Sequence, residues 1–312
     1  MHQDAPLSYF LHSHGPAAGP TQWLDWIFTS IVCLVCLIVA VLLVWALIRR
    51  RPADAGDIRS RQGEGLMWIY VGTGVSTAAL IAMAIYAVMA LNAVANPPTE
   101  PALTIRVTGY DWWWSADYPA NDGSAFATAN EIHIPTGQPV RVELKTADVI
   151  HAFWVPQLAG KTQMIPGTTN VQWLQADQPG IYRGQCTQFC GLQHAHMAFE
   201  VVAQSPSDFA AWRAHQAEPA AATSDPGQQI FIDNCGSCHA VRGTAAAGGH
   251  APDLTHLMSR RQLGAGTLDN TPANLALWIA HPQKVKPGVN MADTVLPPAD
   301  LVRLETYLGT LK

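Results

Sequence analysis

Twelve consecutive residues, CTQFCGLQHAHM at positions 186–197, contain several side chains that bind soft metal ions. The potential ligands recur every three or four positions, at Cys186, Cys190, His194 and Met197. A tetrahedral zinc site would need its ligand pairs on separate turns and would leave the methionine without a role. Thiolates, a thioether and an imidazole together favour copper, and two cysteines in one loop could bridge two copper ions. A disulfide beside surface histidines is the alternative.

A second histidine for such a copper centre has to come from elsewhere in the chain. His151, in the segment DVIHAFWVP, is the candidate, because strand-like residues flank it and a proline ends the run. The predicted site therefore joins one loop to a strand that lies earlier in the sequence.

Near the C-terminus, Cys235-Gly-Ser-Cys238-His239 forms the C-x-x-C-H signature of a covalently attached c-type haem. In that arrangement both thiols add to haem vinyl groups, and the adjacent histidine becomes the proximal iron ligand. A redox-active dithiol would explain the two cysteines but not the histidine that follows them. The sequence therefore predicts a haem site in a separate C-terminal unit that begins and ends with helical patterns.

A methionine on the other haem face would keep the iron low-spin and raise its potential, as an electron carrier requires. Met291, in the loop PGVNMAD before the last predicted helix, is expected to be that ligand. Met258 is the alternative, but it follows His239 so closely that little chain is left to reach the opposite face. The carbonyl of Pro252 is expected to accept a hydrogen bond from Nδ1 of His239.

Two long apolar stretches precede these motifs. Residues 26–48 and 66–95 carry no charged side chain, and charged residues make up only 13% of the chain, against about 25% in a typical soluble protein. As a helix rising about 1.5 Å per residue, each stretch is long enough to cross a bilayer. The sequence therefore predicts two transmembrane helices, with Cys33 and Cys36 as small apolar side chains in the first.

Basic residues set the expected orientation of this helical hairpin. No lysine or arginine precedes the first apolar stretch, whereas the connecting segment contains Arg49, Arg50, Arg51, Arg59 and Arg61. The positive-inside rule places that segment in the cytoplasm and both termini outside. The N-terminal stretch lacks a basic region and is not expected to be an intact signal peptide. The net charge of −5 gives no support to a nucleic-acid partner.

Between the apolar stretches and the haem motif, residues 103–203 form short runs in which apolar and polar residues alternate. LTIRV, VRVEL and NVQWLQA have this period of two, and the turn sequences IPTGQP and ADQPG separate such runs. The pattern predicts a small antiparallel β-sandwich or barrel of Greek-key type. SPSDFAAWRAHQAE then predicts a short helix capped at Ser207, followed by an alanine- and proline-rich linker.

Together these features resemble subunit II of a haem–copper cytochrome c oxidase with a cytochrome c domain fused at its C-terminus, as in caa3-type enzymes. The resemblance is carried by the two apolar stretches and by GYDWWW, DVIHAFWVP, KTQMIPG, CTQFCGLQHAHM, CGSCH and GVNMAD. It implies a multidomain fold: a two-helix transmembrane hairpin, a cupredoxin-like Greek-key β-sandwich and an all-α class I cytochrome c domain. The expected boundaries are 1–22 for a periplasmic segment, 23–96 for the hairpin with a cytoplasmic loop at about 49–65, 97–204 for the cupredoxin domain, 205–225 for a linker and 226–312 for the cytochrome domain.

In that family the spacing Cys-x3-Cys-x3-His-x2-Met binds a dinuclear copper centre, CuA. The ligands that the resemblance implies are the bridging thiolates of Cys186 and Cys190, one histidine for each copper (His151 and His194), Met197 and the backbone carbonyl of Gln188. The same spacing leaves His196 as a neighbour of the centre. His133, in EIHIP, is expected to be an ordinary strand histidine.

Position 188 departs from the family pattern. The family usually has glutamate there, whose carboxylate reaches a Mg²⁺ ion at the contact with subunit I, whereas this chain has Gln188. The carbonyl that faces copper needs no particular side chain, so the copper centre is expected to survive. A neutral amide is a poorer ligand for Mg²⁺ than a carboxylate, so a weakened or absent magnesium site is expected.

Two further residues acquire roles from the resemblance. Trp112, the first tryptophan of GYDWWW, corresponds to the surface residue that receives electrons from cytochrome c; the alternative is an aromatic cluster that closes the sandwich, which suits Trp114 better. Strand alternation would point Trp112 and Trp114 to one face and Trp113 to the other. Glu64 stands where many family members carry a glutamate at a proton-uptake channel of subunit I, although a carboxylate at a helix start is also favourable by itself.

The resemblance implies an electron-transfer subunit of a terminal oxidase in the bacterial plasma membrane, in contact with lipid. Electrons from cytochrome c or an upstream cytochrome complex would reach haem c, pass to CuA and continue to haem a and the haem a3/CuB site of subunit I, with subunit III as a further partner. O₂ would be reduced to water with proton translocation, at a site outside this chain. The alternatives are the CuA subunit of a nitric oxide reductase and a free-standing, membrane-anchored copper and haem carrier.

Overall fold

A computed structural model describes residues 11–49, 65–119 and 125–312 of the chain. The chain divides into two compact units, of which one is Gly19–Asn96 and the other combines the residues before it with Pro97–Lys312. Of the five arginines that predict the orientation, only Arg49 lies within the described residues.

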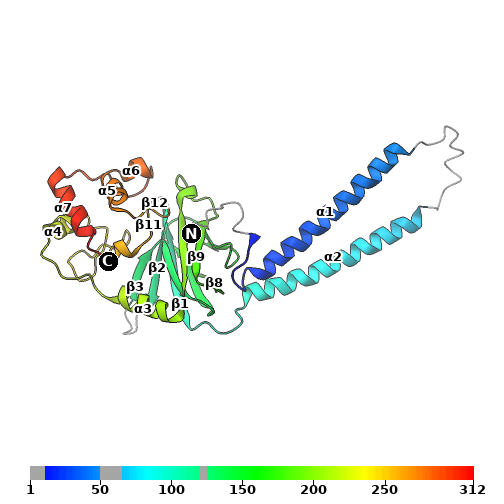
Figure 1. Cartoon of the computed structure of the whole chain (residues 1–312), viewed down its shortest axis with the longest axis horizontal. Helices are drawn as coiled ribbons and strands as arrows, with labels where there is room; N and C mark the ends of the chain where they lie inside the picture. The colour runs from blue at the N-terminus through cyan, green and yellow to red at the C-terminus, as the bar shows by residue number, and fades with distance from the viewer. Residues whose placement is uncertain (1–10, 50–64, 120–124) are drawn as a thin grey trace. The chain divides into compact units, whose positions relative to one another are not determined.

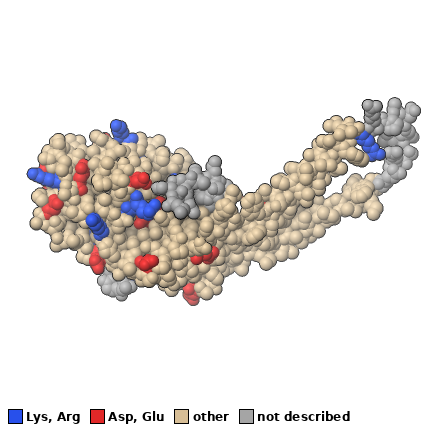
Figure 2. Space-filling model, in the orientation of Figure 1, with Lys and Arg blue, Asp and Glu red and all other residues tan. Residues whose placement is uncertain are grey.

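Helices α1 (Gly19–Ile48) and α2 (Leu66–Ala95) make up the first unit (Figure 1). Each has 30 residues, so each is about 45 Å long, more than the roughly 30 Å of a bilayer's hydrocarbon core. The helices contact each other, yet α1 has no buried residue and α2 buries only Ala90. On the face drawn in Figure 2, their described side chains are uncharged except beside the grey connecting segment. Both helices are long and apolar enough to cross a membrane, in agreement with the two predicted spans.

The second unit contains a β-sandwich of two five-stranded sheets, with strand orders β3-β2-β1-β5-β8 and β4-β10-β9-β6-β7. The strands of the first sheet are β1 (Leu103–Tyr110), β2 (Trp113–Pro119), β3 (Ala125–Ala129), β5 (Val140–Thr146) and β8 (Asn170–Leu174). The strands of the second sheet are β4 (Glu131–Pro135), β6 (His151–Trp154), β7 (Thr162–Met164), β9 (Gly180–Cys186) and β10 (Ala198–Gln204). The predicted sandwich is therefore confirmed.

The prediction that the sandwich is wholly antiparallel is wrong at two pairings. β1 runs parallel to β5, and β4 runs parallel to β10. Each pair joins strands that are distant in the sequence, so no hairpin constrains their direction. The alternation of side chains identifies which face of a strand is buried but carries no information about its partner.

Alternation along the strands builds the core of the sandwich. In β5, Val140, Val142 and Leu144 are fully buried, while Arg141 between them is exposed. Aromatic side chains fill the space between the sheets, where Trp114 meets Phe153 edge-on at a ring-centroid distance of 5.8 Å. Such packing makes the sandwich a rigid support for the loops at its ends.

Residues 11–18, for which no structure was predicted, pack against the sandwich. The backbone N–H of His14 donates to the carbonyl of Gln157, and the N–H of Asp177 donates to the carbonyl of His14. Gly15 allows this close approach, because a Cβ at that position would lie 2.0 Å from the carbonyl oxygen of Gln175. The segment before α1 is thereby part of the folded unit.

The C-terminal part of the second unit is helical. Its elements are α4 (Pro226–Asn234), α5 (Pro272–Ala280), α6 (Pro282–Val285) and α7 (Pro298–Leu308), with the short hairpin of β11 (Gln262–Leu263) and β12 (Leu268–Asp269). α4 packs against α7 (Figure 1), and a Cβ at Gly227 would lie 2.2 Å from the carbonyl oxygen of Arg303. The two helices can therefore meet closely only because Gly227 has no side chain.

Helix α3 (Pro206–Ala217) connects the two parts and packs on the sandwich. Its cap is Ser205, whose Oγ accepts a hydrogen bond from the N–H of Asp208, so the predicted cap at Ser207 is wrong. The capping hydroxyl has to precede the first helical turn, and Pro206 already occupies that turn. Trp212 on this helix stacks on His133 of β4, with ring centroids 3.9 Å apart. His133 is a buried strand residue, as predicted.

Candidate metal centre

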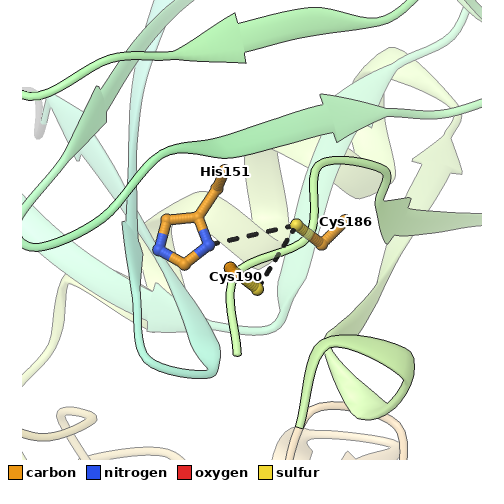
Figure 3. A group of neighbouring side chains, drawn as sticks. All are labelled: His151, Cys186 and Cys190. Carbon is orange, nitrogen blue, oxygen red and sulfur yellow. Dashed lines mark hydrogen bonds between the residues drawn. The ribbon is translucent and has the colours of Figure 1, made fainter. Parts of the chain in front are cut away.

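Two neighbouring strands bring the separated parts of the predicted copper site together. β9 ends at Cys186, β6 begins at His151, and the two strands pair so that Phe153 lies opposite Cys186. The loop after Cys186 returns through Cys190 and a short 3-10 helix, His194–His196, into β10. The centre therefore lies at one end of the second sheet (Figure 3).

The six predicted ligand groups lie close to one another. The sulfur atoms of Cys186 and Cys190 are 3.8 Å apart. The sulfur of Cys186 lies 3.9 Å from Nδ1 of His151 and 3.2 Å from the carbonyl oxygen of Gln188. The sulfur of Cys190 lies 3.5 Å from Nδ1 of His194 and 3.8 Å from Sδ of Met197. A disulfide would require sulfurs about 2.05 Å apart. Both cysteines are free thiols and buried, which removes the alternative of a disulfide in this structure.

The two buried thiols, Cys186 and Cys190, differ in how readily they lose a proton. The hydrogen bond from Cys190 lowers the pKa of Cys186 to about 3, against burial, which acts in the opposite direction. The hydrogen bond to that thiolate and burial raise the pKa of Cys190. Thiolate is the form that binds metal, so one sulfur is already in its binding form without any metal. A cation between the two sulfurs would favour ionisation of the second.

His151 is fully buried, and its ring is oriented by Asp148. Nε2 lies 2.8 Å from Oδ1 of Asp148, so Nδ1 faces Cys186 (Figure 3). Burial alone would lower the pKa of His151, but the hydrogen bonds to Asp148 and Cys186 raise it to about 9. Burial alone would raise the pKa of Asp148, which hydrogen bonds from His151, Val149 and Asp111 lower instead. A carboxylate behind a histidine in this way is typical of metal sites.

Met197 and its surroundings hold the other end of the ligand loop. Met197 is fully buried, and its carbonyl accepts hydrogen bonds from the indole of Trp114 (3.3 Å) and the N–H of Cys186 (3.1 Å). His196 is exposed and lies 2.8 Å through Nδ1 from the side-chain oxygen of Gln193. Nδ1 of His194 therefore faces the sulfur of Cys190, whereas His196, two positions later, faces Gln193.

Trp112 lies in the turn between β1 and β2, so the prediction that it alternates along a strand with Trp113 and Trp114 is wrong. The two strands pair up to Tyr110 and Trp113, which leaves residues 111 and 112 to make the turn. The indole N–H of Trp112 donates to the carbonyl of Cys190 at 2.8 Å. The turn thus places this ring against the ligand loop.

The side chain of Gln188 extends away from the thiols. Its Oε1 accepts a hydrogen bond from the amide of Gln163, at 3.4 Å. Its carbonyl faces Cys186, so the backbone and the side chain of this residue point to different neighbours. Glu64, the other residue with an expected role outside the copper ligands, lies outside the described residues.

The haem motif begins at the C-terminal end of α4, where Cys235 is the C-cap residue. Nδ1 of His239 lies 2.7 Å from the carbonyl oxygen of Pro252, which confirms the predicted hydrogen bond. Burial lowers the pKa of His239, so the ring is neutral, donates from Nδ1 and leaves Nε2 for iron. Burial also raises the pKa of the Cys235 thiol to about 11. These residues fit a covalent haem held by two thioethers and one imidazole.

The two methionines considered for the other haem face differ in their surroundings. Met258 packs against the core of the helical part, and its N–H donates to the carbonyl of Leu311. Met291 is not part of the core clusters found among the described residues, and its carbonyl accepts from the side chain of Gln283 at 2.7 Å. Met258 therefore already has a packing role, whereas Met291 lies on a loop.

Asp148 and Lys286 are functional candidates that the sequence analysis did not identify. Asp148 stands three positions before His151, and a carboxylate this near a predicted histidine ligand was a usable signal. Lys286 comes from the helical part, and its Nζ donates to carbonyls of the sandwich. Nothing in its sequence surroundings indicates that contact.

Comparisons with known proteins cover both parts of the second unit. The protein-family model described as cytochrome c oxidase subunit II, periplasmic domain, matches residues 103–205, and the model described as cytochrome c matches residues 224–312. Cytochrome c oxidase subunit 2 of Alkalihalophilus pseudofirmus is 34% identical over 313 residues, which cover 95% of this chain and 90% of that protein. Its counterpart in Bacillus subtilis is 32% identical, over 68% of this chain and 63% of that protein.

Among solved structures, the periplasmic domain of subunit II of cytochrome oxidase from Bradyrhizobium japonicum is similar. It is 33% identical, covers 38% of this chain and 96% of that chain, and has a TM-score of 0.36.

Proposed function

The chain belongs to the cytochrome c oxidase subunit 2 family, and on that premise we propose which of its residues carry out the family's function. It is the electron-transfer subunit of a haem–copper oxidase. It passes electrons from cytochrome c and its own haem c, through a dinuclear copper centre, to haem a in subunit I, where O₂ is reduced to water.

The copper ligands that we propose are Cys186 and Cys190 as bridging thiolates, His151 and His194 through Nδ1, Met197 through its sulfur and Gln188 through its carbonyl. The observation that carries this proposal is the buried pair of thiols 3.8 Å apart, flanked by Nδ1 atoms of two histidines. A soft, mixed sulfur and nitrogen donor set of this kind suits copper. When bound, a thiolate-bridged copper pair shares one electron across both ions and so exchanges electrons with little rearrangement.

The protein residues around the centre hold it rigid. When a copper ion displaces the proton from Nδ1 of His151, the hydrogen bond to Asp148 would keep the remaining proton on Nε2. The carbonyl of Met197 is fixed by Trp114 and Cys186, which limits movement of the thioether. Preorganised ligands of this kind lower the cost of each electron transfer, because little has to move.

The haem ligands that we propose are His239 and Met291, with thioether bonds from Cys235 and Cys238. The hydrogen bond from His239 to the Pro252 carbonyl supports the proximal role. The packing of Met258 in the core supports Met291 as the second axial ligand. Methionine and histidine together give a high potential, which suits a donor that feeds an oxidase.

The remaining assignments follow the family in the same way. We keep Trp112 as the residue through which electrons reach the copper centre and Glu64 as a proton-uptake residue. The termini of the chain lie on the periplasmic side of the membrane in this proposal, and subunit III joins the complex. Gln188 leaves the magnesium site at the contact with subunit I weak or empty. The expected domain boundaries given above belong to the same proposal.

The test is spectroscopic and uses the purified oxidase complex. A mixed-valence dicopper signal in the electron paramagnetic resonance (EPR) spectrum, beside a low-spin c-type haem, would support the ligand set. Cys186→Ser should abolish the dicopper signal and leave the haem spectrum unchanged. A dicopper signal that persists in this variant would refute the bridging role of Cys186.

The two rival functions give different results with the same preparation. A nitric oxide reductase would consume NO rather than O₂. A free-standing carrier would purify alone and show no absorbance from haem a.

A further inference from the structure

Lys286 is a buried lysine that forms no ion pair with a carboxylate among the residues that the structure describes. Its side chain is 2% exposed, and its Nζ donates to the carbonyls of Trp112 (2.9 Å), His196 (2.7 Å) and Gly264 (2.8 Å). An ammonium has three donors, and all three are used. Burial lowers the pKa of Lys286 to about 7, because the charged form loses its contact with water.

The partners of Lys286 belong to different parts of the second unit. Lys286 directly follows α6 of the haem domain (residues 226–312), and Gly264 belongs to the turn of its β11–β12 hairpin. Trp112 and His196 belong to the sandwich. The lysine therefore fastens two loops of the haem domain to the copper-binding part of the chain.

Both sandwich carbonyls belong to residues that lie close to proposed copper ligands. Trp112 donates its indole N–H to the carbonyl of Cys190, and His196 stands between His194 and Met197 in the sequence. The ammonium thus binds the backbone of Trp112, whose ring contacts the loop at Cys190, and the backbone of the segment that holds two other proposed ligands. The three hydrogen bonds of Lys286 go to backbone carbonyls and not to the side chain of a proposed ligand.

Neighbouring contacts make this a docking surface rather than a single bond. Gln193 donates to the carbonyl of Pro287 at 2.6 Å, and the N–H of Ala198 donates to the carbonyl of Ala265 at 3.1 Å. At Gly288 a Cβ would lie 2.8 Å from Cδ2 of Leu192. The residues that follow Lys286 therefore lie directly on the copper loop.

A second patch strengthens the same interface farther from copper. Arg261 of the haem domain donates from its backbone N–H to Glu131 and from its guanidinium to Glu200, both at 3.0 Å. The side chain of Arg261 is 47% exposed, so this ion pair contributes little by itself. Lys286 is the buried anchor of the interface.

We propose that Lys286 is a positioning residue for electron transfer within the chain: it seats the haem domain on the copper loop, so that the haem and the copper centre keep one fixed separation. This inference rests on the proposed function. The haem domain is then docked on the sandwich rather than free to move on its linker, and Lys286 is the residue that holds it there.

The principal experiment compares two lysines of the same short segment in the purified oxidase complex. Lys286→Met removes the donors and keeps most of the side-chain volume, while Lys284→Met changes an exposed lysine two positions earlier. The rate of electron transfer from reduced haem c to oxidised copper is measured by flash photolysis, and the haem–copper separation by pulsed EPR. Copper content, haem content and both spectra are recorded for each variant.

Lys286→Met should slow the transfer about tenfold and broaden the distribution of separations, because hydrogen bonds of a charged group shift an equilibrium by about that factor. The Lys284→Met rate should equal that of the wild type. Unchanged copper and haem spectra with a slower rate would show that the separation has changed rather than the centres. Equal rates in the two variants would overturn the inference, and an absent dicopper signal in the wild type would instead refute the proposed function.

A cross-link provides an independent test should Lys286→Met lose copper. A Cβ built at Gly288 lies 4.0 Å from Cβ of Leu192, within the range of a disulfide. The double variant Leu192→Cys/Gly288→Cys, oxidised, should transfer electrons at the wild-type rate and should restore the rate of Lys286→Met wherever copper is retained. A loss of rate on oxidation that returns on reduction would show that the haem domain has to leave this surface, and would overturn the inference.

Discussion

Asp148 Oδ1 lies 2.8 Å from Nε2 of His151, and the opposite nitrogen of the same ring faces the sulfur of Cys186. The pair comes from one four-residue stretch, DVIH, in which Asp148 also accepts hydrogen bonds from the N–H groups of Asp111 and Val149. Backbone N–H groups therefore hold the carboxylate in place, and the carboxylate in turn orients the ring of His151.

Asp148→Asn should weaken copper binding by about 10- to 100-fold, the usual effect of losing a carboxylate behind a ligating histidine. If the amide oxygen takes the place of Oδ1 and accepts from His151 and Val149, the NH₂ is turned toward the N–H of Asp111, which now donates to Oδ2. Copper retained against a chelator, measured on the purified oxidase, gives the affinity. Asp177→Asn, at an exposed site of the same sandwich, is the control and should behave as the wild type.

Met197→Leu should keep the fold and change the copper centre. The residue is fully buried, and leucine has nearly the same volume, so the free energy of unfolding should fall by less than about 1.5 kcal/mol. The thioether is lost, so the EPR spectrum of the copper centre and its reduction potential should both shift. Identical spectra in the wild type and the variant would show that the sulfur of Met197 is not a ligand.

Gln188→Glu should create or strengthen a magnesium site, because a carboxylate is a better ligand for this hard cation than an amide. Manganese titration followed by EPR would detect a tight site in the variant complex and a weak or absent one in the wild type. Gln163, whose amide donates to Gln188, provides the matched control: Gln163→Glu adds the same charge next to it. A tight manganese site in the wild type would contradict the prediction.

Met291→Leu should convert the haem from low-spin to high-spin and lower its potential, because leucine offers no ligand to iron. Met258→Leu, which replaces a partly buried methionine packed against the core by an apolar side chain of similar size, should leave both properties unchanged. Optical spectra of the reduced and oxidised complexes distinguish the two outcomes. The reverse pattern would assign the axial position to Met258.

Glu131 should make the sandwich sensitive to acid. Burial alone would raise its pKa, but hydrogen bonds from His133 and the N–H of Arg261, with the nearby charge of Arg260, lower it. The ionised carboxylate therefore stabilises the fold at and above its unfolded pKa of about 4.3, and this contribution is lost as the pH falls below that value. The neighbouring Glu200 has a raised pKa, chiefly through burial, so it contributes in the opposite sense.

Glu131→Gln should accordingly cost about 2 kcal/mol of stability near neutral pH, as expected for a buried hydrogen bond to a charged group, and less below about pH 4. The midpoint of copper release from the purified oxidase during denaturant titration, at a series of pH values, gives the comparison. Glu143→Gln removes a partly exposed ion pair of the same sandwich and should cost less than about 1 kcal/mol at any pH. A pH-independent loss at Glu131 would contradict the prediction.

Residue spacing predicted the metal loop, the haem motif and the membrane helices, because each is a local pattern. Cys186, Cys190, His194 and Met197 lie within one loop, and its turns alone bring them together. The sequence could not predict the contact of Lys286 with Trp112 and His196, because it depends on how two domains dock. The sequence also did not predict the turn at Trp112 or the parallel pairing of β4 with β10, because the packing of the whole sandwich determines which strands pair and where they end.

The meeting of α4 and α7 at Gly227 has a consequence for the order in which the protein is made. The haem motif follows α4 directly, whereas α7 comes later in the sequence and is therefore synthesised after the motif. A C-terminal truncation before residue 298 would present both haem-binding cysteines on a domain whose first helix has no partner. Haem that attaches before α7 arrives would bind an open chain, and the final helix would then close the domain around it.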